Sequence, residues 1–178
     1  MNRTTLLMAT FVLAGASVAA IPDVSAQGRV RGHAVVHTGD GGRTAVTGAA
    51  ARGDRGSYER GHRVDSDGQG NVSGRSGAYA AGADGGTAQR QGSFYRNADG
   101  SAGRQGSASV NGPNGGTATT SGSIARDASG NVNGSRSTSA TGQSGNTYNG
   151  STTVQNGTVT HTGTCTNAVG ETIACRGN

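Results

Sequence analysis

The chain has 178 residues, of which 34 are glycine and none is tryptophan, and its formal net charge is +5. Helices are nearly excluded, because glycine in a helix interior costs ~1 kcal/mol per residue relative to alanine. With only 31% hydrophobic residues, a large buried core is also excluded. A thin sheet, an assembly that gains burial from neighbouring molecules, and a largely disordered secreted protein remain open.

Residues 1–26 have the pattern of a secretory signal peptide. A basic start with Arg3 precedes an apolar run from Leu6 to Ala20, and Val24-Ser25-Ala26 forms a small-residue cleavage site. The run is shorter than the roughly 20 residues that span a bilayer. We therefore expect cleavage near Ala26, no membrane span, and a secreted protein located in the periplasm, at the cell surface or outside the cell.

Residues 27–63 are rich in arginine and glycine, and we expect them to form a flexible N-terminal arm, with extra short strands at Val35-Val36 and at Thr44–Thr47 as the alternative. A basic arm of this kind is typical of contacts with polyanions such as an acidic polysaccharide or nucleic acid. The alternative interpretation is a solvated linker. The candidate polyanion contacts are Arg29, Arg31, Arg43, Arg52, Arg55, Arg60 and Arg63.

Residues 64–154 contain an internal repeat. Glycine recurs every 15 residues inside polar turn clusters, and residues of β type lie between these clusters. The predicted repeat turns are at Gly70, Gly85, Gly100, Gly115, Gly130 and Gly145. Such a repeat builds a scaffold or a surface rather than a pocket.

The apolar residues follow a longer period of 30 residues. Their largest set is Phe94, Ile124 and Val154, and every member of the pattern is even-numbered. Because side chains alternate between faces along a strand, the shared parity predicts one weakly apolar face. Matching Ala80 with Ala88 centres a turn at 84, and matching further apolar pairs centres turns at 98 and 128.

Two all-β architectures fit the repeat. The first is an antiparallel β-meander rich in glycine, serine and threonine, built of strand-turn units of ~15 residues. The second is a β-solenoid with 30-residue rungs, in which equivalent residues stack in ladders. The turn sequences favour the meander. Strands of this composition have a poorly specified register. We expect self-association through the weakly apolar face and the open edges to supply the missing burial.

Residues 155–178 are expected to form a C-terminal strand and a disulfide hairpin. Cys165 and Cys175 are the only cysteines, and in an oxidising compartment they are expected to pair. The five residues from Asn167 to Glu171 suit a tight turn between them, with glycine where positive φ is needed.

The sequence disfavours catalysis and small-molecule chemistry. No serine, histidine and carboxylate recur in a register that would converge on a site. The acidic segment Asp65–Asn71 has alternating oxygen ligands, but it lacks the rest of a calcium motif, so we interpret it as a β-turn. We expect no catalytic, cofactor or metal site and no small-molecule substrate. The expected function is structural, through β-sheet self-assembly or adhesion, with polyanion binding as the alternative.

Overall fold

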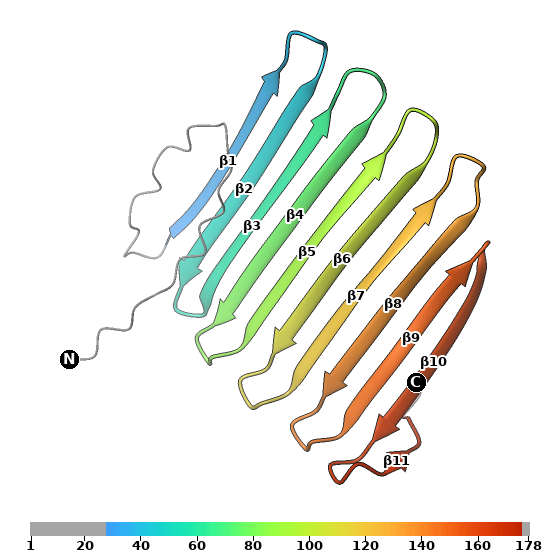
Figure 1. The fold of residues 1–178 in the computed structure, drawn as a ribbon. Helices are drawn as coiled ribbons and strands as arrows, with labels where there is room; N and C mark the ends of the chain where they lie inside the picture. Colours follow the sequence, from blue (N-terminus) through green and yellow to red (C-terminus); the bar gives the residue numbers. More distant parts are fainter. Residues whose placement is uncertain (1–27, 176–178) are drawn as a thin grey trace.

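The computed structural model describes residues 28–175, and these form one open antiparallel sheet (Figure 1). Eleven strands follow one another in chain order, so each strand pairs with its sequence neighbours. The predicted meander is therefore confirmed, and the solenoid is not formed. The strands are β1 (Gly28–His37), β2 (Arg43–Gly53), β3 (Gly56–Ser66), β4 (Val72–Gly82), β5 (Thr87–Arg96), β6 (Ala102–Asn111), β7 (Thr117–Arg126), β8 (Val132–Thr141), β9 (Thr147–Gln155), β10 (Thr158–Thr166) and β11 (Thr172–Ile173).

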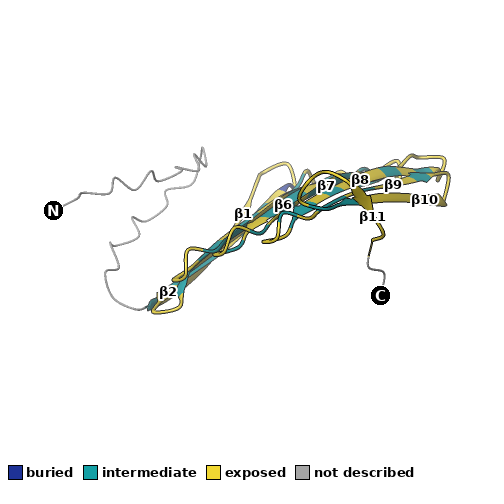
Figure 2. Cartoon of the chain, turned by 90° about the horizontal axis from the view of Figure 1, so that it is seen from below, coloured by how far each residue is buried: buried dark blue, intermediate teal, exposed yellow. Residues whose placement is uncertain are grey.

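The sheet is a single layer when it is seen along its edge (Figure 2). Within residues 28–175 no hydrophobic side chain is buried, and the buried positions are Gly42 and Gly74. Aromatic rings replace part of the missing core by lying over glycines of the neighbouring strand. Phe94 covers Gly74, and Tyr95 covers Gly103, so that a Cβ on either glycine would collide with the ring. This pairing shields the backbone without a second layer.

Most strands are joined by the same five-residue turn. The first residue donates its backbone N–H to the carbonyl of the fifth, and the fourth residue donates to the carbonyl of the first. Glycine occupies the fourth position because its φ is positive there, a region that disfavours other residues. The six predicted repeat glycines all have positive φ, between 80° and 98°.

Two connections are shorter, and they reverse the parity of the faces. Asp54–Arg55 joins β2 to β3, and Asn156–Gly157 joins β9 to β10. Both have an even number of residues, whereas the five-residue turns have an odd number. An even connection pairs odd-numbered with even-numbered residues, so each face changes parity there. Asn156 and Gly157 have φ of 49° and 84°, as a two-residue hairpin requires.

The predicted register is correct at one turn and shifted at two others. Ala80 pairs with Ala88 as predicted. Phe94, however, pairs with Arg104, and Ile124 pairs with Gly134, which moves the turn centres from 98 and 128 to 99 and 129. The cause is the turn hydrogen bond, which pairs Asn97 with Ser101 and Asp127 with Asn131 and outweighs contact between small apolar side chains. A shift of two residues keeps every side chain on its predicted face.

The structure corrects the expectation of a flexible N-terminal arm over residues 27–63. Residues 28–66 form β1, β2 and β3, which belong to the same sheet as the repeat. Short strands at Val35-Val36 and Thr44–Thr47 were an alternative, but the full strands were not predicted because their turns at 38–42 and 54–55 do not follow the 15-residue glycine phase. Their arginines alternate with alanine, valine and glycine, which is the period of a strand. The predicted signal peptide and its cleavage site lie outside the described residues.

The C-terminal end of the sheet has the predicted arrangement of a strand and a hairpin. Cys165 and Cys175 are joined by an S–S bond of 2.04 Å, and Cys165 pairs with Ile173 of the short β11. Asn167 accepts backbone hydrogen bonds from Val169 and Glu171 inside the intervening turn. No helix of residues 28–175 is long and apolar enough to cross a membrane.

Candidate functional site

The register divides the side chains of the sheet into two unlike faces. One face holds the odd-numbered residues of β1, β2, β10 and β11 and the even-numbered residues of β3–β9. We call this the basic face, because nine exposed arginines and all four histidines of the chain lie on it. They are Arg29, Arg31, Arg43, Arg60, Arg90, Arg96, Arg104, Arg126, Arg136, His33, His37, His62 and His161.

Acidic side chains are absent from the basic face within the described strands. Glu59 and Asp65 are the acidic residues of these strands, and both lie on the opposite face. There Asp65 forms an ion pair with Arg63 at 2.7 Å and accepts a hydrogen bond from Thr44. The Arg63 guanidinium, by hydrogen bonding, holds the pKa of Asp65 below its usual value. The positive charge of the basic face is therefore not neutralised within its own strands.

The opposite face is dominated by hydroxyl and amide side chains, and we call it the hydroxyl face. From β5 to β10 it carries no charged residue, and on β10 it consists of five threonines at alternate positions. Cross-strand hydrogen bonds connect some of these groups, such as Ser121 with Ser137 at 3.2 Å and Thr147 with Thr166 at 2.6 Å. The hydroxyl face is electrically neutral over more than half of the sheet.

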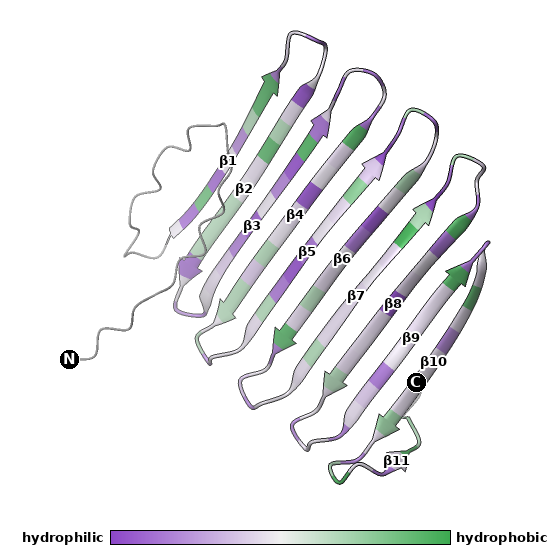
Figure 3. Cartoon of the chain, in the orientation of Figure 1, coloured by the Kyte–Doolittle hydropathy of each residue, from purple (hydrophilic) through white to green (hydrophobic). Residues whose placement is uncertain are grey.

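The predicted apolar residues share the basic face with the arginines. Their register forms a row across the strands, in which Val64 neighbours Gly74, then Phe94, Arg104 and Ile124. Figure 3 shows the hydrophobic positions scattered among hydrophilic ones on the long strands. The predicted single face is confirmed for residues 72–154, but it is basic as well as weakly apolar.

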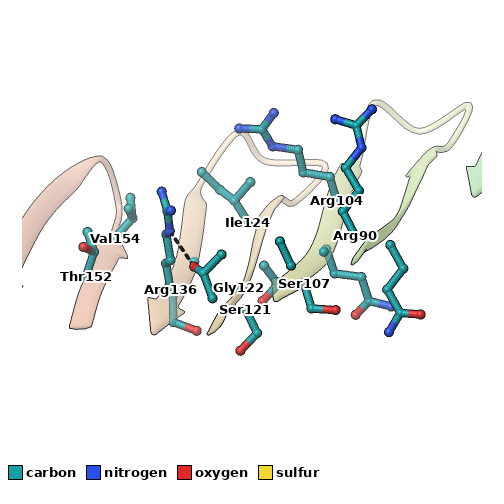
Figure 4. A pocket seen from close by; sticks show the side chains of 17 residues that line it. Arg90, Arg104, Ser107, Ser121, Gly122, Ile124, Arg136, Thr152 and Val154 are labelled. Carbon is teal, nitrogen blue, oxygen red and sulfur yellow. Dashed lines mark hydrogen bonds between the residues drawn. The ribbon is translucent and has the colours of Figure 1, made fainter. Parts of the chain in front are cut away.

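A shallow hollow of about 470 Å³ lies on the basic face over β5–β9. Its floor includes Gly106 and Gly122, where the absence of side chains exposes the backbone. Arg90, Arg104 and Arg136 border it, and Figure 4 shows their side chains on the same side as Ile124, while Ser121 points the other way. Arg136 Nε donates to Thr120 Oγ1 at 3.0 Å.

The seven candidate contacts from the predicted arm separate in the structure. Arg29, Arg31, Arg43 and Arg60 all lie on the basic face. By contrast, Arg52 and Arg63 lie on the hydroxyl face, and Arg55 lies in the connection between β2 and β3. The arginines of the repeat that join the first group are Arg90, Arg96, Arg104, Arg126 and Arg136. The sequence signal for this face is that the arginines of each strand mostly occupy alternate positions, and therefore project from one side of the sheet.

The remaining described acidic residues lie in the turns at the strand ends. Asp67 and Asp127 occupy the first turn position, where each accepts a backbone N–H and the side-chain amide of the fifth residue. Asp99 accepts from Ser101. The pKa values of these three carboxyls are lowered, first by those side-chain hydrogen bonds and also by the backbone donors. Negative charge is thus confined to the rims of the sheet, where it stabilises turns.

The predicted turn at Asp65–Asn71 uses its oxygens within the chain. Asp67 accepts from Gln69 and Asn71, and Asp65 is engaged by Arg63 and Thr44. Over residues 28–175 no group of three or more histidine, cysteine or acidic side chains is placed to hold a metal ion. The acidic segment therefore acts as a turn in this structure.

No family model matches the chain, and no curated protein or solved structure matches it. The function must therefore be argued from the sheet itself.

Proposed function

We propose that this is an exported structural protein that acts by β-sheet association with further copies, at the cell surface or in the extracellular matrix. The observation that carries the proposal is a single-layered sheet without a buried hydrophobic side chain among its described residues. Ordering a residue costs roughly 1–2 kcal/mol of backbone entropy. One uncovered layer buries too little apolar surface to offset that cost well. Burial against other molecules would supply the rest.

Export is supported by two features of the chain. The predicted signal peptide gives the route, although it lies outside the described residues. The bond between Cys165 and Cys175 is compatible with an oxidising compartment outside the cytosol.

The outer edge of β1 is one candidate association surface. The backbone N–H of Thr38 donates to the carbonyl of Gly42, so it points toward β2. Successive N–H groups along a strand point to opposite sides. The N–H groups of odd-numbered residues of β1, such as His33 and Val35, therefore point away from β2. At the other end, β11 pairs with only Cys165 and Thr166, which leaves the outer edge of β10 open over Thr158–Thr164. Pairing of β1 with β10 of a second copy is heterologous and would build an open filament.

The two faces differ in their capacity to associate. Two basic faces placed against each other would bring exposed arginines together without acidic partners in their strands, which is unfavourable. The hydroxyl face is neutral from β5 to β10 and bears small side chains. Face-to-face association is therefore expected through the hydroxyl face, with the basic faces turned outward.

The distribution of charge favours a second function, polyanion binding. Nine exposed arginines share one face, whereas the described acidic residues lie on the other face or at the rims. A continuous field of one sign attracts polymers of the opposite sign, and such binding weakens as salt increases. Both functions are compatible, because assembly and polyanion binding use different surfaces.

The edge provides the sharpest test of assembly. In sedimentation velocity and negative-stain electron microscopy of the oxidised exported chain, we expect filaments or layers whose amount rises with protein concentration. The variant Val35→Pro removes an outward N–H and keeps the inward bonds to β2, so it should shorten or abolish filaments while circular dichroism still reports β structure. A strictly monomeric wild-type protein at high concentration would refute the proposal.

A further inference from the structure

The basic face contains a straight row in which arginine and alanine alternate. The register runs from Arg31 to Ala49, Arg60, Ala78 and Arg90, one residue per strand from β1 to β5, and continues to Ala108 on β6. Neighbouring strands are about 4.8 Å apart, so successive arginines of this row are roughly 10 Å apart. The alanines between them are short, and all three arginines are exposed.

We propose that this row is the docking line of a linear acidic polysaccharide, which crosses the strands of the basic face. The inference rests on the second proposed function and names its partner and site. Guanidinium groups bind carboxylate or sulfate through two parallel hydrogen bonds, and regular spacing suits a polymer with regularly repeated acidic groups. Face and partner are complementary in charge, since the described strands place no acidic residue beside the row.

The rest of the basic face suits a sugar chain. The apolar side chains of Val64 and Ile124 lie four residues along the strands from the docking line, and they offer contact to the C–H faces of sugar rings. The glycine-floored hollow bordered by Arg104 and Arg136 leaves room beside Ile124. Small side chains let a polymer approach the backbone closely.

A polysaccharide fits this face better than a nucleic acid does. The described aromatic residues of the basic face are Tyr58, Phe94 and Tyr148. Phe94 lies over Gly74, and the Tyr148 ring lies beside Gly150 and Gly163, so both are already packed against their own sheet. Single-stranded nucleic acid needs free rings on which successive bases stack.

The chain supplies matched charge variants on the two faces. Arg60→Gln with Arg90→Gln removes two charges from the docking line. Arg52→Gln with Arg75→Gln removes two charges from exposed residues of the hydroxyl face. Both pairs have the same net charge, so a difference between them reports the face and not the overall charge.

The probe is polygalacturonate, measured by isothermal titration calorimetry at low and high salt, with neutral dextran as the uncharged control. We expect salt-sensitive binding to polygalacturonate alone, weakened about tenfold or more by R60Q/R90Q, because charge-assisted bonds are lost. R52Q/R75Q should change affinity by less than about twofold, as expected for groups remote from the contact. A second pair, R31Q/R90Q, tests the same row if the first folds poorly by circular dichroism.

Three results would overturn the inference: no binding, equal losses from both variant pairs, or tighter face-dependent binding to DNA or to anionic phosphatidylglycerol vesicles. Sedimentation of the same variants without polysaccharide measures assembly separately. A wild-type protein that assembles but does not bind polygalacturonate contradicts only this inference, and a wild-type protein that binds polygalacturonate but stays monomeric contradicts only the structural proposal.

Discussion

At the scale of single residues, the chain uses its two charge types for different tasks. Aspartates at the strand ends accept hydrogen bonds from turn backbone and side chains, as Asp67 and Asp127 do. Arginines are distributed along the strands and mostly project from one face. This separation means that turn stability depends on ionised carboxylates, whereas the arginines remain accessible to partners.

The turn carboxylates make stability sensitive to acid. The pKa values of Asp67, Asp99 and Asp127 are lower in the folded protein than the usual 3.8. A lowered folded pKa gives stabilisation that is complete above the usual value and is lost as pH falls through the lowered one. We expect the thermal unfolding midpoint to fall on acidification below about pH 4. The triple variant D67N/D99N/D127N should lose much of this acid dependence, and an unchanged dependence would contradict the assigned role.

At the scale of elements, the five-residue turn determines where strands end and which residues pair. Its fourth-position glycine needs positive φ, as Gly130 shows with φ of 91°. A Cβ on Gly130 would meet no atom within 4 Å. The requirement for glycine there therefore comes from the backbone conformation and not from crowding.

Gly130→Ala tests this conformational requirement against a matched glycine in a strand. Placing alanine in the left-handed region should destabilise the sheet by about 1–2 kcal/mol. Gly32 in β1 is equally open but has no positive φ, so Gly32→Ala should be neutral or stabilising by up to ~1 kcal/mol. Chemical denaturation of both variants checks the expected order. Equal effects of the two substitutions would mean that the turn does not demand glycine.

Sequence patterns predicted the repeat turns because glycine at a fixed period marks positive φ directly. They also predicted the shared face of Phe94, Ile124 and Val154, because parity survives a register shift of two residues. They did not predict the exact pairing of β5 with β6. The sequence does not show that the turn hydrogen bond between Asn97 and Ser101 determines the register more strongly than contact between apolar side chains. The full length of strands β1–β3 and their place in the same sheet were missed because the connection Asp54–Arg55 breaks both the glycine phase and the parity.

The candidate binding surface was predicted only in part. Arg29, Arg31, Arg43 and Arg60 were identified as polyanion contacts by their density alone. Residues 28–66 were expected to be flexible, so no face could be assigned to their side chains. Once these residues are strands, the even connection at Asp54–Arg55 places Arg60 on the same face as Arg31, while Arg52 and Arg63 lie on the other.

At the scale of the whole molecule, the sheet is a surface without an interior. Its described residues bury no hydrophobic side chain, and its rings shield glycines instead of forming a second layer. We therefore propose that association completes the fold: copies cover the edges and the hydroxyl face, and the basic face remains available for an acidic polymer. Stability and association are then linked by mass action, because only the folded sheet associates.

The most direct test of this proposal is the thermal unfolding midpoint of oxidised residues 27–178, measured over about a hundredfold range of protein concentration. We predict a midpoint that rises continuously with concentration, in parallel with the associated fraction seen by sedimentation. A midpoint that stays constant, in a protein that remains monomeric throughout, would show that the single layer is stable alone and would contradict the proposal.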